Sequence, residues 1–259
     1  MLSAFGALLF RAQHGTVPRR AIWIGRASIA AAWVFTWGWV ALETGSMAGQ
    51  LSAWPVVLGD TQFGHIVLIR LTLLALAAVA GGGPLAAALA GLGAVSLAGH
   101  GHAWAMAGGP SLLLMAETLH LAAAGAWLGG LLPLIALLGE ASAPAALLAA
   151  RRFARLGTVC VALIAATAVY QASVLVGSFA GLVGTAYGQV ASVKGLLFLV
   201  LLALAARHRF GLTPALAGLG AVRATHALRR SVALEAAIGL LVVLAAGWLT
   251  SLEPAMSMD

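Results

Sequence analysis

Residues 111–138 read SLLLMAETLHLAAAGAWLGGLLPLIALL, and this stretch decides the fold. Glu117 is the one charged residue in it. A helix needs about 20 predominantly apolar residues to cross the hydrocarbon core of a bilayer. The stretch exceeds that length, so it predicts a transmembrane helix.

The rest of the chain has the same character. Hydrophobic residues make up 62% of it and charged residues 8%, whereas soluble domains carry about 25% charged residues. A membrane β-barrel would alternate apolar and polar residues over strands of about 10 residues, and no such alternation is present. The sequence therefore predicts an all-α, polytopic membrane helix bundle with eight spans, the first of them shortened. The predicted spans are residues 1–13, 21–43, 61–80, 84–105, 111–138, 154–177, 186–206 and 231–251.

Basic residues predict the orientation. Lys and Arg in short loops mark the cytoplasmic side of a membrane protein. The arginines cluster between spans one and two, five and six, and seven and eight, which all fall on one side, whereas the opposite joints carry none. We therefore expect a multi-pass protein whose C-terminus lies outside, which in a bacterial inner membrane is the periplasm. This use of the basic residues explains the pI of 11.3 without a nucleic-acid partner.

An internal repeat is visible in two matching segments. Thr61-Gln62-Phe63-Gly64 precedes Arg70, and Thr185-Ala186-Tyr187-Gly188 precedes Lys194; 185 minus 61 gives an offset of 124 residues. The same offset aligns Gly6 with Gly130. The spacing predicts a parallel duplication of a four-helix unit, one of the duplication types found in transporters. The two repeats would be residues 1–110 and 111–259.

Histidine and methionine point to a metal. His65, His100, His102 and His120 fall on the outer half of the predicted bundle, whereas we interpret His14, His208 and His226 as solvated residues of inner joints. The five methionines beyond Met1 are also on the outer side: Met47, Met106, Met115, Met256 and Met258. Thioether sulfur suits Cu(I), and imidazole suits copper in either oxidation state. The combination favours copper over zinc, which more often recruits Cys or several carboxylates.

Spacing refines the candidate ligands. Met106 follows His102 by four residues, and Glu117 precedes His120 by three, so each pair shares a helical face. Glu117 is either a ligand or the group that orients His120. The alternative for each histidine is a structural, hydrogen-bonded role, which we weigh most heavily for His65.

A charge network is predicted inside the membrane. Arg70, Lys194 and Glu235 fall within spans, where unpaired charges are costly. We expect Arg70 and Lys194 to pair with Glu235, Glu117 or backbone carbonyls. This network is either structural or part of an ion path.

Five stretches of the sequence match a known family. They are Gly101-His102-Ala103, His120-Leu121-Ala122-Ala123-Ala124-Gly125-Ala126-Trp127-Leu128-Gly129-Gly130-Leu131, Thr185-Ala186-Tyr187-Gly188 with Lys194, Arg229-Arg230-Ser231-Val232 with Glu235, and Leu249-Thr250 before Pro254. With these stretches the chain resembles the copper resistance D (CopD) family of bacterial inner-membrane proteins. The resemblance implies membrane handling of copper, eight spans, His102 and His120 as copper ligands, and a periplasmic copper-binding partner of the CopC type.

The sequence is compatible with three functions. The first is a copper transporter that moves the metal from periplasm to cytoplasm through an outer His/Met site, with the direction implied by the resemblance. The second is a b-type cytochrome in which His65 and His120 ligate haem. The third is a protein that delivers copper to another membrane protein without transporting it. No P-loop, nucleophile–base pair or dinucleotide fingerprint is present, so we expect no enzyme.

Overall fold

The protein is helical, as the sequence predicts. The structure, a computed structural model, describes residues 1–15, 17–100, 112–218 and 220–255, and none of these residues forms a strand. The first half contains α1 (Leu2–His14), α2 (Arg19–Ala48), η1 (Leu51–Ala53), α3 (Trp54–Asp60), α4 (Gln62–Ala80), α5 (Pro84–Val95) and η2 (Ser96–His100). The second half contains α7 (Leu112–Glu140), α8 (Ala143–Leu175), α9 (Phe179–Gly184), α10 (Ala186–Arg207), the π-helical turn η3 (His208–Leu212), α11 (Thr213–Ala215) and α12 (Ala221–Leu249).

Five helical segments of the described chain are long and apolar enough to cross a membrane: α4, α7, α8, Ala186–Ala215 and α12. The protein is therefore a multi-pass membrane protein. The number of eight spans stays a prediction. The 13 residues of α1 extend about 20 Å, less than the bilayer core, and Pro84–His100 is also a shorter apolar helix.

Two helices begin earlier than the hydropathy pattern predicts. α8 begins at Ala143 and α12 at Ala221, so arginines that we expected in joints lie on helices instead. Pro144 occupies the first turn of α8, where proline is tolerated. Arginine is a good helix former, so these helices continue beyond their apolar segments.

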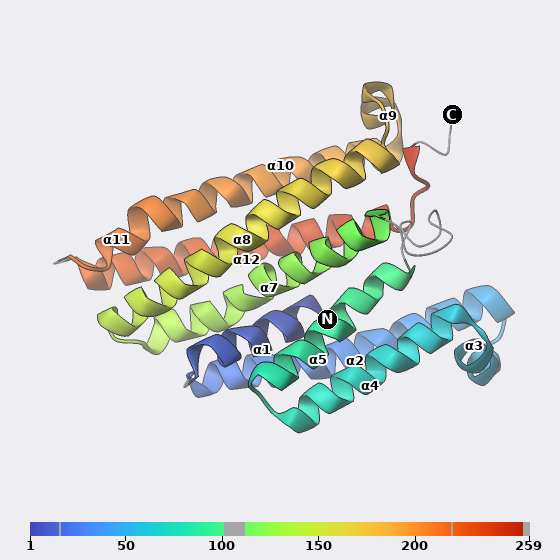
Figure 1. Cartoon of the computed structure of the whole chain (residues 1–259), viewed down its shortest axis with the longest axis horizontal. Coiled ribbons are helices and arrows are strands. Elements are labelled where there is room, and N and C mark those ends of the chain that lie inside the picture. Colours follow the sequence, from blue (N-terminus) through green and yellow to red (C-terminus); the bar gives the residue numbers. More distant parts are fainter. Residues whose placement is uncertain (16, 101–111, 219, 256–259) are drawn as a thin grey trace.

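The two ends of the bundle differ in charge. At the end that we call the basic end, Arg20 of α2 forms an ion pair with Glu140 of α7 at 3.3 Å. Arg11 of α1 donates to the carbonyl of Gly81, just after α4. Figure 1 shows α11 at the left end of the molecule, whereas α3 and α9 lie at the right; we call the latter the α3/α9 end.

The two halves have matching elements at the offset of 124 residues. α2 begins at 19 and α8 at 143, and α4 begins at 62 and α10 at 186. Thr61 and Thr185 cap α4 and α10 in the same way, because each hydroxyl oxygen accepts from the glycine N–H three residues on, at 3.0 Å. A short helix, α3 or α9, precedes each cap. The match ends after α4 and α10, since η3 and α11 stand where the first half has α5.

The halves meet where α1 crosses α7. A Cβ atom on Gly6 would collide with the backbone of Gly125 and Gly129, and one on Gly129 would collide with the carbonyl oxygen of Leu2. Small residues allow such backbone contact between helices in a membrane, where lipid supplies no hydrophobic driving force for association. Trp127, Leu131 and Leu134 of α7 belong with Phe10 of α1 to the largest hydrophobic cluster of the described residues.

Gly6→Ala should destabilise the fold by about 1–3 kcal/mol, because the added methyl group has no space against α7. The matched control is Gly38→Ala in α2, where a Cβ meets nothing within 4 Å. That change should stabilise the protein by about 0.5–1 kcal/mol, the usual gain from glycine to alanine inside a helix. Thermal unfolding in detergent measures both, and equal melting temperatures would contradict the α1–α7 contact.

Candidate functional site

His120 occupies a buried position on α7. It is 9% exposed, and its Nδ1 lies 2.9 Å from the hydroxyl of Thr167 on α8. The Thr167 hydroxyl donates to the carbonyl of Leu163 at 2.7 Å, with Ile164 as a second acceptor at 3.1 Å. Its oxygen is thus left to accept from Nδ1–H, since a hydroxyl has one hydrogen. This bond fixes the tautomer and leaves the lone pair on Nε2, the arrangement that orients a metal-binding histidine.

His120 lines a cavity of about 750 Å³ between α7, α8, α10 and α12, which we call the His120 cavity. Its wall is largely apolar, with the polar side chains of Gln171, Tyr187, Ser192 and Lys194. The charge of Lys194 acts on the His120 ring. A cation beside His120 therefore needs a neighbouring negative charge.

Glu117 supplies that negative charge. It lies one turn before His120 on α7, and it is close enough to Lys194 and Tyr187 for its charge to act on both. We expected Lys194 to pair with Glu235, Glu117 or backbone carbonyls; that pairing stays a prediction, and the charge of Glu117 acts on Lys194. The site thus combines an oriented imidazole with a carboxylate and a lysine, from α7 and α10.

His100 lies in a different cluster, in the first half. Its ring packs edge-on against Trp39, with centroids 4.8 Å apart, and against Phe63 at 5.1 Å. Its Nε2 is buried and has no hydrogen-bond partner among the described residues. The described contacts of His100 are aromatic side chains of α2 and α4.

Arg70 lies in the same cluster and is fully buried. Its Nε donates to the hydroxyl of Ser96 at 3.0 Å, and its guanidinium lies 5.3 Å from the centre of the Trp39 ring. We expected Arg70 to pair with a carboxylate or a backbone carbonyl, and that pairing stays a prediction. Among the described residues, its guanidinium contacts the Ser96 hydroxyl and the Trp39 ring, the latter as a cation–π contact.

His65 has a structural role in α4. It is exposed, and its Nε2 donates to the carbonyl of Gly59 at 2.7 Å. At the positions 124 residues later, the side-chain amide of Gln189 donates to the carbonyl of Val183 at 3.2 Å. Since glutamine makes the same bond, this contact requires only a hydrogen-bond donor.

The described methionines near the α3/α9 end face outward. Met115 and Met47 are each 54% exposed, whereas His120 lies on the buried face of α7. His102, Met106, Met256 and Met258 lie outside the described residues. Within the described part of the chain, no three side chains of His, Cys, Asp or Glu come together as a metal site.

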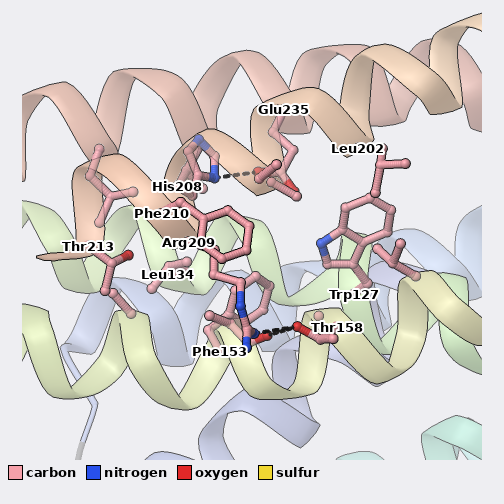
Figure 2. A pocket seen from close by; sticks show the side chains of 18 of the residues that line it. Trp127, Leu134, Phe153, Thr158, Leu202, His208, Arg209, Phe210, Thr213 and Glu235 are labelled. Atoms are coloured by element: carbon pink, nitrogen blue, oxygen red, sulfur yellow. Dashed lines mark hydrogen bonds and ion pairs between the residues drawn. The ribbon is translucent and has the colours of Figure 1, made fainter.

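Glu235 has a partner that the sequence analysis missed. Its carboxylate lies 3.0 Å from Nδ1 of His208, which we had interpreted as a solvated residue. That interpretation was wrong, because the His208 side chain is only 12% exposed. The pair lines a second cavity, of about 450 Å³, which Figure 2 shows between α8, α10 and α12. The four-residue spacing of Ser231 and Glu235, both on the buried face of α12, was the available signal.

Thr167→Val should release His120 while it preserves shape. Without the hydroxyl acceptor, the ring loses the bond that selects the Nδ1–H tautomer, so ¹⁵N spectra of histidine-labelled protein should change from one tautomer to a mixture. Thr36→Val is the matched control, because the buried Thr36 hydroxyl bonds only to the carbonyl of Ala32. An unchanged His120 signal in Thr167→Val would contradict the assigned bond.

Comparison with known proteins identifies the family. Residues 1–113 match the model described as Copper resistance protein D-like, N-terminal domain. Residues 147–249 match the model described as Copper resistance protein D. Neither the curated proteins nor the solved structures gave a match. The two family matches together cover most of the chain, which belongs to the copper resistance protein D family.

Proposed function

We propose that the protein binds copper at His120 and carries it across the bacterial inner membrane, from the periplasm to the cytoplasm. The observation that carries this proposal is the His120 side chain, which bonds to the Thr167 hydroxyl through Nδ1 and lines a cavity among candidate membrane spans. Imidazole is a good ligand for copper in both common oxidation states. Membership of a copper resistance family supports copper as the cargo.

The other candidate residues have different roles in this proposal. Glu117 balances the charge of the bound cation and of Lys194. His102, His100 and Met106 are further candidate copper ligands in this proposal, as the sequence pattern predicts. Met115 contributes at most a first contact, because its side chain faces away from the buried face of α7. The bond of His65 to Gly59 supports leaving His65 outside the copper site.

We further propose a duplicated architecture with eight membrane-crossing helices and a periplasmic C-terminus. The starts of α2 and α8 and of α4 and α10, each 124 residues apart, support the duplication, as do the matching threonine caps of α4 and α10. The arginine contacts at the basic end support the orientation, since basic residues favour the cytoplasmic side. A periplasmic partner of the CopC type would then deliver copper at the α3/α9 end.

The haem alternative has less support. A b-type site needs two histidines facing one another, and the exposed His65 bonds to the carbonyl of Gly59 while His120 faces its own cavity. Purified protein should therefore show no Soret absorption band. A Soret band would contradict the copper proposal and indicate a b-type cytochrome.

His120→Ala with His102→Ala should abolish stoichiometric copper binding, because both family-matched ligands are lost. Elemental analysis of the purified protein after copper loading measures this loss. His65→Gln is the matched control; it introduces the residue found at position 189 and should leave copper content unchanged. Unchanged copper in the double variant would overturn the site.

Copper uptake into proteoliposomes should separate transport from delivery. Wild-type protein should accumulate copper in the lumen, and His120→Ala should lower the initial rate by at least about 10-fold if its loss weakens affinity as loss of metal-site residues commonly does. Glu140→Gln, at an exposed ion pair, serves as the control. Binding without uptake in the wild type would favour the non-transporting delivery protein.

A further inference from the structure

His208 and Glu235 form a buried, hydrogen-bonded polar group in the half of the molecule nearer the basic end. Nδ1 of His208 lies 3.0 Å from Oε2 of Glu235, and Nε2 lies 2.7 Å from the hydroxyl of Ser231. Glu235 is 2% exposed, whereas the His208 side chain is 12% exposed. Both ring nitrogens are therefore bonded, one to a carboxylate and one to a hydroxyl that can donate or accept.

The three residues have distinct tasks in this geometry. The carboxylate of Glu235 accepts from Nδ1–H, which leaves Nε2 as the nitrogen that gains or loses a proton. When Nε2 carries a proton, it donates to the Ser231 oxygen. When Nε2 has lost it, the Ser231 hydroxyl rotates and donates to Nε2. The hydrogen bond is kept in both states, and the pair changes from a net charge of zero to minus one.

The cavity beside the pair holds few competing charges. Of the titratable side chains on α7, α8, α10, η3, α11 and α12, those that line it are His208, Glu235 and Arg209. Arg209 is turned to Thr158 of α8, to whose hydroxyl it donates at 2.7 Å (Figure 2). The Arg229 guanidinium of α12 instead packs beside Gly139 of α7.

The local backbone is unusual at this point. His208 opens a π-helical turn directly after α10. Such turns are rare and often occur at functional sites. An ionisable group within a membrane bundle is costly and is retained mostly for function, while a buried ion pair by itself adds little net stability. The π turn and the cavity thus point to the same residues independently.

This cavity also adjoins the His120 cavity. Trp127, Ala165 and Leu202 line both. Trp127 is almost fully buried and packs edge-on against Phe198 with ring centroids 6.4 Å apart. The cavity at which His208 changes its protonation therefore shares Trp127 with the cavity of the proposed copper site.

We propose that His208, Glu235 and Ser231 form a proton-binding site that exchanges one proton at Nε2 of His208 with the cavity. The ligand is a proton, and the site is separate from the copper ligands. The exchange itself does not depend on copper. Its use to drive copper movement rests on the proposed function.

The proton site is tested without copper by ¹⁵N NMR of histidine-labelled protein in lipid, titrated from acidic to alkaline pH. The wild type should show a His208 signal, assigned by its loss in His208→Gln, that changes reversibly between protonated and neutral Nε2. Glu235→Gln should alter this change, because the carboxylate 3.0 Å from Nδ1 of His208 is lost. Glu140→Gln, which removes the exposed carboxylate paired with Arg20, should leave it unaltered.

Two results would overturn the proton site. One is a His208 signal that stays constant throughout the titration. The other is a titration in Glu235→Gln identical to that of the wild type. The wild-type titration, assigned with His208→Gln, decides the proposal even where Glu235→Gln fails to fold.

Coupling is measured separately, by copper uptake into proteoliposomes with an imposed pH gradient. Wild-type uptake should depend on the gradient, and Glu235→Gln should lose that dependence. Equal copper uptake by the wild type with and without the pH gradient would overturn the coupling. Absence of any uptake would remove the proposed transport function and, with it, the coupling, while the NMR result on the proton site would stand.

Discussion

The close contact between α1 and α7 at Gly6, Gly125 and Gly129 is the constraint on which the bundle depends. In water, apolar side chains would drive two helices together. In lipid they do not, so association depends on how closely the backbones approach and how many dispersion contacts they gain. α1 is too short to cross the bilayer by itself, and it is held instead by α7, α5 and α2. Because α7 also contacts α8 and α12, this one helix joins both halves.

Much of the fold follows from the sequence for direct physical reasons. Apolar length predicts the all-α membrane bundle, and the two T-x-[FY]-G segments mark true helix starts because their threonines cap α4 and α10. The helix starts at Ala143 and Ala221 could not be read from hydropathy. A helix does not end where the apolar segment ends, and arginine-rich turns extend it at little cost. The short helices α3 and α9 were also missed, because their few residues carry no periodic pattern.

The site was predictable in part. His120 stood out as an ionisable residue deep in an apolar stretch, and the structure places it in a cavity with an orienting threonine. Its partner Thr167 is 47 residues away and no local pattern links the two. The partners of Arg70 were missed for a different reason: cation–π contact with Trp39 requires knowing how α2 and α4 pack. His208 was misjudged since its arginine neighbours indicated a solvated joint, whereas the π turn directs it inward toward Glu235.

Pro133, inside α7, gives the central contact a mechanical consequence. A proline has no N–H, so the carbonyl four residues earlier loses its usual partner, and that carbonyl belongs to Gly129. Among the described long helices, α7 alone carries an interior proline. Its bending stiffness is therefore lowest at the crossing with α1, where the two halves press together. A tilt of the first half would therefore bend α7 at this point. The longer of the two segments of α7, which carries His120 nine residues from Gly129 toward the α3/α9 end, would then undergo the larger displacement.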